Sequence, residues 1–135
     1  MKTKPVLTLD DARKMAYAAE KEAVKNGWSV SIAVVDDGGH PLHFQRMDNA
    51  APLSAHISQA KAKTAALGGK ESKAFEDMIN AGRTAFLSAP AIDGMLEGGI
   101  PVIVNGACIG AVGVSGVKAP EDAQIARAGV AALGA

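Results

Sequence analysis

The sequence predicts an α+β fold in which a single antiparallel β-sheet is flanked by α-helices. Two turn signals, Asp37-Gly38-Gly39 and Asn105-Gly106, each lie between two apolar runs, which is the short-range pattern of a β-hairpin. Segments whose apolar residues recur at helical spacing lie before, between and after these hairpins. The expected order is therefore α-β-β-α-α-β-β-α, and such an order favours one sheet covered by helices.

The first half of the chain supplies a helix and a hairpin. Thr8-Leu9-Asp10-Asp11 is close to a capping box and predicts the start of the first helix. Asn26-Gly27 ends this helix, because both residues tolerate a positive φ. Residues 28–36 then form the first strand, with alternate residues on its two faces. Residues 40–47 form the return strand. Pro41 cannot donate a ladder hydrogen bond, so that strand starts late or lies at an edge.

The second half contains three further helices around the second hairpin. Pro52 suits the first turn of a helix that ends at Gly68-Gly69. Residues 71–80 are expected to form a short helix, residues 82–99 loops with one short strand, and Pro120 opens the last helix. The apolar stripe of the second helix is expected to consist of Leu53, Ile57, Ala60, Thr64 and Leu67.

Composition excludes several classes of function. The 135 residues predict one domain, residues 1–135, and Lys+Arg 14 against Asp+Glu 14 argues against binding to nucleic acid or to anionic membranes. No run of 18 apolar residues is present, so no membrane-spanning segment is expected. Cys108 is the single cysteine, which excludes an intrachain disulfide and a CxxC site and favours an inert thiol in an apolar strand.

Location and assembly follow from the N-terminus and from the small side chains. Residues 1–5 show no apolar signal-peptide core, so a cytoplasmic protein is expected. Alanine and glycine are abundant and aromatic residues make up 4%. Such a core buries little apolar area per residue, and we therefore expect a homo-oligomer, whether dimer, tetramer or octamer.

The three histidines are candidate ligands for haem or iron. His40 and His43 resemble a chelating pair, but residues three apart on a strand point to opposite faces, so a two-histidine metal site would need a bulge. The alternative is one exposed histidine in the turn and one on the strand. His56, in the second helix, is either a surface residue or a ligand.

Arg46-Met47-Asp48 is a second candidate site. Arg46 is expected on a buried strand face with Leu42 and Phe44, where its guanidinium needs a carboxylate. An internal partner, Asp36 or Asp48, and an anionic ligand are equally consistent with this position. Met47 either packs on a flat ligand or belongs to the core.

Lys61 and the glycine-rich run 110–116 are further candidates. Lys61 flanks the stripe of the second helix, so its ammonium either extends to the surface or holds a carboxylate ligand. The run lacks the spacing of a dinucleotide fingerprint. A helix that begins after Ser115-Gly116 either receives a ligand carboxylate at its N-terminus or packs closely on the strand.

The remaining motifs follow one another along nearly the whole chain. They are Ala33-Val34-Val35-Asp36 with Gly38-Gly39, Phe44-x-Arg46-Met47-Asp48-x-Ala50, Ser54, Lys61-Ala62-x-Thr64-Ala65, Gly98-Gly99-Ile100-Pro101, and Ile109 to Gly116 with Asp122 and Ala126. In these motifs the sequence resembles the GlcG/HbpS family of haem-degrading or haem-binding domains, which includes the C-terminal domain of PduO-type proteins. The segment from Val117 to Asp122 departs from the usual family pattern of a further Gly and a Gln or Glu before the Asp.

The resemblance implies a profilin-like fold, homo-oligomers, and haem or iron binding in some members. Other members accompany glycolate, propanediol or aromatic breakdown. We therefore expect a small-molecule-binding protein whose ligand is haem, a related tetrapyrrole or iron. The alternatives are an enzyme or accessory protein that acts on a small organic acid in a catabolic operon, and an oligomer without a ligand. No nucleophile–base pair is evident, so no catalytic residue is predicted. The expected ligand-binding residues are Arg46, Met47, Asp48, Lys61, Gly98, Gly99, Ser115 and Gly116.

Overall fold

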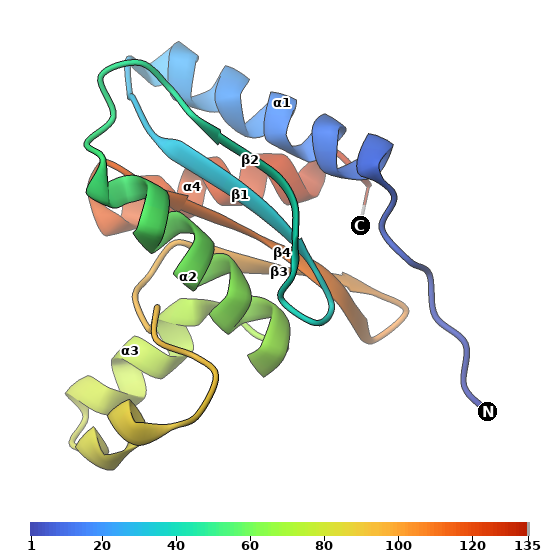
Figure 1. Ribbon diagram of the computed structural model, residues 1–135, viewed down its shortest axis with the longest axis vertical. Helices are drawn as coiled ribbons and strands as arrows, with labels where there is room; N and C mark the ends of the chain where they lie inside the picture. Colours follow the sequence, from blue (N-terminus) through green and yellow to red (C-terminus); the bar gives the residue numbers. More distant parts are fainter. Residues whose placement is uncertain (135) are drawn as a thin grey trace.

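The computed structural model describes residues 1–134 and confirms the predicted order of helices and strands (Figure 1). In residues 82–99, where loops with one short strand were expected, the chain forms a 3₁₀ helix and no strand before Gly99. In chain order the elements are α1 (Leu9–Asn26), β1 (Ser31–Asp36), β2 (Pro41–Arg46), α2 (Leu53–Gly68), α3 (Ser72–Asn80), the 3₁₀ helix η1 (Thr84–Ser88), β3 (Gly99–Val104), β4 (Ala107–Ser115) and α4 (Ala119–Ala131).

The strands form one antiparallel sheet in the order β2-β1-β4-β3. Helices α1 and α4 cover one face and pack on each other, while α2 covers the opposite face (Figure 1). The predicted α+β architecture is therefore correct. β2, which contains Pro41, is an edge strand, as its missing N–H predicted.

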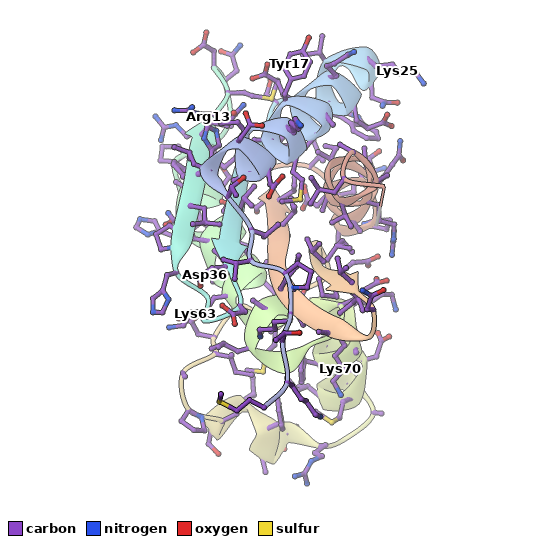
Figure 2. All side chains as sticks on the ribbon, turned by 90° about the vertical axis from the view of Figure 1, so that its right-hand side faces the viewer. Arg13, Tyr17, Lys25, Asp36, Lys63 and Lys70 are labelled. Carbon is purple, nitrogen blue, oxygen red and sulfur yellow. The ribbon has the colours of Figure 1, made fainter. Side chains whose placement is uncertain are left out.

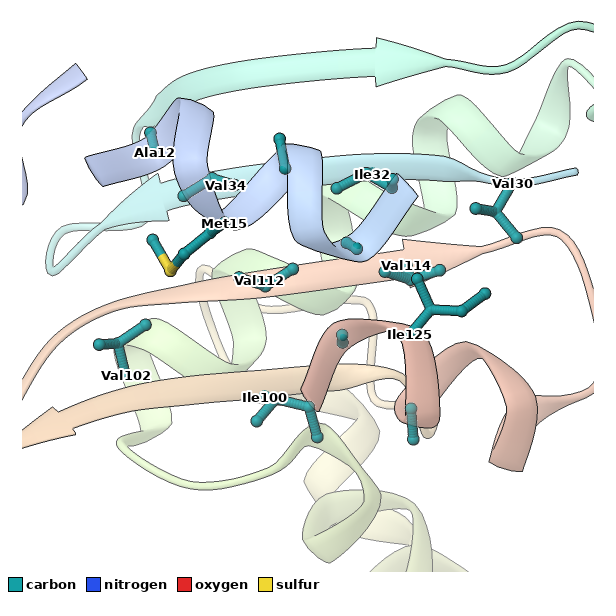
Figure 3. Close-up of a cluster of buried hydrophobic side chains, with 14 of the residues drawn as sticks. Ala12, Met15, Val30, Ile32, Val34, Ile100, Val102, Val112, Val114 and Ile125 are labelled. Carbon is teal, nitrogen blue, oxygen red and sulfur yellow. The ribbon is translucent and has the colours of Figure 1, made fainter. Parts of the chain in front are cut away.

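The two faces of β1 are both buried, and they differ in the size of their side chains. Ile32 and Val34 face α1 and α4, where they join the larger core cluster with Met15, Val112 and Ile125 (Figure 3). The opposite face of β1 joins a smaller cluster under α2, made of Ala33, Val35, Ala62, Ala65, Ala66 and Ala111. The predicted alternation along this strand is confirmed, although β1 begins at Ser31 rather than at residue 28.

The face that helix α2 turns to the sheet includes Thr64 of the predicted stripe but neither Leu53 nor Leu67. Leu53 is 64% exposed and Leu67 is 42% exposed. The residues that α2 buries are Ser54, Ser58, Lys61, Ala62, Thr64, Ala65 and Ala66. The cause lies in the sheet, because a Cβ added at Gly113 would lie 2.1 Å from the Ser58 carbonyl oxygen. The helix backbone rests on this glycine, and only a face without bulky apolar side chains fits so close.

The turns match their sequence signals. Thr8 and Asp11 form the predicted capping box of α1. Asn105 and Gly106 have φ values of 51° and 79°, as a two-residue hairpin with two left-handed positions requires. Gly69 ends α2 with a φ of 68°. Among residues 1–134, no helix combines the length and the apolar character needed to cross a membrane.

Candidate functional site

The predicted ligand-binding residues gather at one end of the sheet. Strand β2 ends at Arg46, β4 ends at Ser115, and β3 begins at Gly99. Because neighbouring strands are antiparallel, these three points meet at the same end. Ser31, at the start of β1, pairs with Arg46 on one side and with Ser115 on the other. The backbone thus brings the predicted residues together, although their side chains have different surroundings.

Lys61 lies inside the protein at this end of the sheet. Its side chain is 4% exposed, and the Asp122 side chain that it contacts is 3% exposed. The Lys61 Nζ donates to Asp122 Oδ2 at 3.1 Å and to the Val114 carbonyl oxygen at 2.9 Å. Of the two alternatives for Lys61, extension to the surface is therefore wrong, because Asp122 on α4 supplies a counter-charge in the interior.

The Asp122 carboxylate lies near Ser115-Gly116, where the sequence suggested that the N-terminus of the last helix could receive the carboxylate of a ligand. Its Oδ1 accepts a hydrogen bond from the Val117 backbone N–H at 3.1 Å. Burial raises the pKa of Asp122 above its ordinary value of 3.8, while the charge of Lys61 and the Val117 N–H act in the opposite direction. The donors that were expected to hold a ligand carboxylate therefore hold an internal one.

Gly98 and Gly99 let the backbone pass close to Lys61. A Cβ at Gly98, where φ is +133°, would lie 2.8 Å from Lys61 Nζ, and one at Gly99 would lie 2.3 Å from the Lys61 carbonyl oxygen. The Gly99 N–H also donates to Ser72 Oγ at 2.8 Å. Ser115 is buried as well. These contacts give both glycines a role in packing, and their role in ligand binding stays a prediction.

Arg46 is exposed, which corrects the expectation of a buried strand face. A bulge between Val34 and Val35 interrupts the alternation, so Leu42 packs on the larger core cluster while Phe44 pairs with Ala33 on the other side. Among residues 1–134, Arg46 forms no ion pair with Asp36 or Asp48.

A hollow of about 430 Å³ lies between α1 and the end of β2. Its lining residues are Glu20, Val24, Arg46, Met47 and Asp48. The three residues that the sequence singled out here therefore do share a surface depression. Their role in binding stays a prediction.

His40 and His43 do not converge on one site, even though the required bulge is present. The His40 Nδ1 lies 3.2 Å from Asp36 Oδ1 in the hairpin turn, and the His43 Nε2 lies 2.9 Å from Gln45 Oε1 on β2. Within residues 1–134, no group of three or more His, Cys, Asp or Glu side chains is placed to hold a metal ion. A chelated iron site built on this pair therefore has no support in the fold.

His56 lies on the outer surface of α2, beside two adjoining hollows that we call the α2 groove. The first hollow has a volume of about 300 Å³ and the second about 230 Å³. They share His56, Ala60 and Asp93. The first is otherwise lined by Val35, Gly39, Pro41, Gln59 and Lys63, and the second by Ile57, Gly94 and Leu96.

The α2 groove combines polar groups with apolar walls. Ile57 and Leu96 supply the apolar surface of the second hollow, and Gln59 and Lys63 supply polar atoms to the first. The His56 ring has no hydrogen-bond partner among the described residues, unlike the rings of His40 and His43. Figure 2 shows Lys63 at the level of Asp36, near the turn between β1 and β2. This groove can accept a small molecule that offers both an apolar surface and an anionic group.

Comparison with known proteins identifies the family. Residues 7–131 match the model of the family described as haem degrading protein HbpS-like. Protein GlcG of Escherichia coli strain K12 is 58% identical over 115 residues, which cover 85% of this chain and 85% of GlcG. The chain belongs to the HbpS-like family.

Two solved structures share the fold described here. A crystal structure of a double mutant of Streptomyces reticuli HbpS has a TM-score of 0.88 and 35% identity, covering 100% of this chain and 92% of that chain. The crystal structure of a PduOC:haem complex has a TM-score of 0.84 and 25% identity, covering 95% of each chain. The resemblance that the motifs indicated is therefore confirmed at the level of the family.

The sequence missed part of the groove in this HbpS-like chain. Asp93 lies in a segment without regular periodicity, so nothing in the sequence connected it with His56. Gln59 and Lys63 lie three and seven residues from His56, respectively, and share its face of α2, a spacing that could have linked them once the helix was predicted. Asp122 was visible only as a motif residue and as an acidic residue in the first turn of α4.

Proposed function

We propose that this HbpS-like protein binds haem or a related tetrapyrrole in the α2 groove, with His56 as the axial ligand. One observation carries the proposal: the His56 ring is exposed, lines both hollows and has no hydrogen-bond partner among residues 1–134. A neutral imidazole nitrogen is a common ligand of haem iron. His40 and His43 are less suited, because each ring already has a polar partner.

The residues around His56 fit such a ligand. Ile57, Ala60 and Leu96 offer apolar contacts to a flat macrocycle, and Lys63 offers a cation to a carboxylate. Bound haem would supply an iron centre for redox chemistry or for binding a small ligand. The family description names haem degradation, and a PduOC relative was crystallised as a haem complex, which supports this choice of ligand.

Titration with haemin tests the proposal. We expect a saturable shift of the Soret band with the wild-type protein and loss of that shift in His56→Ala. His40→Ala and His43→Ala are matched controls, since each removes an imidazole outside the groove, and both should bind like the wild type. Saturable binding with an unchanged spectrum in His56→Ala would refute the assignment of the axial ligand.

A small organic acid is the second candidate ligand. The first hollow, of about 300 Å³, places Gln59, Lys63 and His56 around a space suited to a small carboxylate. Lys61 and the start of α4, which the sequence suggested for this role, are engaged with Asp122 instead. A thermal-shift panel of hydroxy- and keto-acids tests this candidate, since a ligand at a hundred times its Kd adds about 2.7 kcal/mol.

Assembly and location stay predictions of the sequence. The exposed Leu53 and Leu67 of α2 are consistent with contact between copies. Light scattering of the purified protein measures the oligomer. A fluorescent fusion tests the expected cytoplasmic location.

A further inference from the structure

Lys63 has an unusual position among the basic residues of the chain. It is half-buried, lines the first hollow of the α2 groove, and forms no ion pair among the described residues. By contrast, the buried Lys61 two residues earlier is matched with Asp122. A partly desolvated ammonium without a counter-ion costs free energy, and an anion that entered the hollow would offset this cost.

Gly39 fixes where the stem of Lys63 lies. This glycine has a φ of +79°, and a Cβ added to it would come 2.8 Å from Lys63 Cγ and 3.6 Å from Lys63 Cβ. The turn between β1 and β2 therefore rests directly on the aliphatic part of Lys63. Any other L-residue at position 39 would be strained by its φ and would displace this stem.

Neither Asp36 in the adjoining turn nor Asp93 in the groove forms an ion pair with Lys63 among the described residues. Asp36 Oδ1 accepts hydrogen bonds from the backbone N–H groups of Gly38 and His40, both at 2.9 Å, which ties this carboxylate to the turn. Asp93 lines the part that the two hollows share, whereas Lys63 lines only the first. The groove is therefore cationic at its Lys63 end and anionic beside Asp93.

The spacing of His56 and Lys63 sets the length of ligand that can reach both. They are seven residues apart on one helix, so they lie on the same face about 10.5 Å apart along the axis. A ligand bound through His56 must therefore extend an anionic arm over two helical turns to meet Lys63.

We propose that the Lys63 end of the α2 groove is a carboxylate subsite shaped by Gly39. A ligand held at His56 reaches this subsite only with a carboxylate remote from the group at His56, and a small free acid occupies the subsite by itself. This inference rests on the proposed function in taking the α2 groove as the ligand site. The carboxylate is either a propionate of a tetrapyrrole or the acid group of a small free acid. The chemistry of the subsite is the same in both cases.

The first experiment compares haemin with haemin dimethyl ester, which keeps the iron and macrocycle and lacks both carboxylates. Lys63→Met retains most of the stem and removes the charge, and Lys2→Met, in the exposed N-terminal segment, is the charge-matched control. We expect Lys63→Met to weaken haemin binding about tenfold or more and to leave the ester unaffected. Lys2→Met should leave both ligands unaffected, and His56→Ala should weaken both.

The outcomes separate the subsite from the choice of haem. An equal effect of Lys63→Met on haemin and on its ester, or no effect on either, overturns a propionate subsite. If His56→Ala binds haemin like the wild type, the proposal that haem is ligated in the α2 groove is wrong. The thermal-shift panel of acids then tests the carboxylate subsite. Acids that stabilise the wild type but not Lys63→Met support it. If no carboxylate of either class distinguishes the two proteins, the subsite is wrong.

Discussion

Lys61 and Asp122 form a buried ion pair that ties α2 to the start of α4. The Nζ to Oδ2 distance is 3.1 Å, and each side chain is almost completely enclosed. The backbone adds two hydrogen bonds to this pair: the Val114 carbonyl oxygen accepts from Lys61 Nζ, and the Val117 N–H donates to Asp122 Oδ1. Removal of either side chain would leave the charge of the other one unpaired in the interior.

Single substitutions at this pair should therefore be strongly destabilising. We expect Lys61→Met and Asp122→Asn each to lower the free energy of unfolding by about 3–5 kcal/mol. The double variant Lys61→Met/Asp122→Asn should lose much less than the sum, because it leaves no buried charge. Urea denaturation of the four proteins gives the coupling energy.

The exposed pair of Lys73 and Asp77 is the control for that cycle. Its Nζ to Oδ2 distance is 2.7 Å, yet both side chains are solvated, so Lys73→Met should change stability little. Additive effects at Lys61 and Asp122 would show that the interior pair contributes no more than this surface pair does.

The contribution of Asp122 to the free energy of unfolding should decrease as pH rises, because burial raises the pKa of this carboxyl group. Its pKa is raised from 3.8, so the folded protein holds this proton more tightly than the unfolded chain does. The contribution of Asp122 is fully present below 3.8 and is lost as pH rises through the folded pKa. The stability difference between wild type and Asp122→Asn should therefore shrink as pH rises through this window.

Comparison with the variant is necessary because exposed carboxylates act in the opposite direction. Hydrogen bonds from Thr8 lower the pKa of Asp11, and Lys4 lowers that of Asp37. The stability that these groups contribute is lost as pH falls, whereas the contribution of Asp122 is lost as pH rises. A plot of wild-type stability against pH therefore contains both effects. A difference that grows as pH rises would mean that the charge of Lys61, and not burial, controls Asp122.

The order of elements could be predicted because its signals are local. Asn105-Gly106 specifies a hairpin turn by itself, and Thr8 with Asp11 specifies a helix start within four residues. The face of α2 that meets the sheet could not be predicted in this way. It depends on Gly113, which lies far from α2 in sequence and admits only a close helix backbone.

The candidate site shows the same division between local and remote signals. The strand ends that carry Arg46 and Ser115 lie at one end of the sheet because strand ends and antiparallel order follow from the hairpins, and the sequence predicts both hairpins. The partner of Lys61 is 61 residues away, and no local rule connects it with Asp122. The α2 groove could not be predicted from the sequence, because α2, the first hairpin and the segment around Asp93 form it only when they pack together.

The contact between Gly113 and α2 predicts a specific cost of adding one methyl group. In Gly113→Ala the new Cβ would lie 2.1 Å from the Ser58 carbonyl oxygen and 2.5 Å from the Ala62 nitrogen, so α2 must move. We expect a loss of about 1–3 kcal/mol, measured by chemical denaturation. Gly106→Asn is the control, since nothing lies within 4 Å of its Cβ position and Asn tolerates a left-handed φ. Equal stability of the two variants would contradict close packing of α2 on β4.

Asp93 should oppose the binding of anionic ligands in the α2 groove. It lines the same hollows as His56, so its carboxylate repels a ligand whose anionic arm extends toward Lys63. Asp93→Asn keeps the shape of the side chain and removes the charge. We expect it to tighten haemin binding about two- to fivefold at low ionic strength, with a smaller gain at higher salt. Asp77→Asn, on the exposed surface of α3, removes an equal charge outside the groove and should leave the Kd unchanged. Weaker binding in Asp93→Asn would instead assign this carboxylate an attractive contact with the ligand.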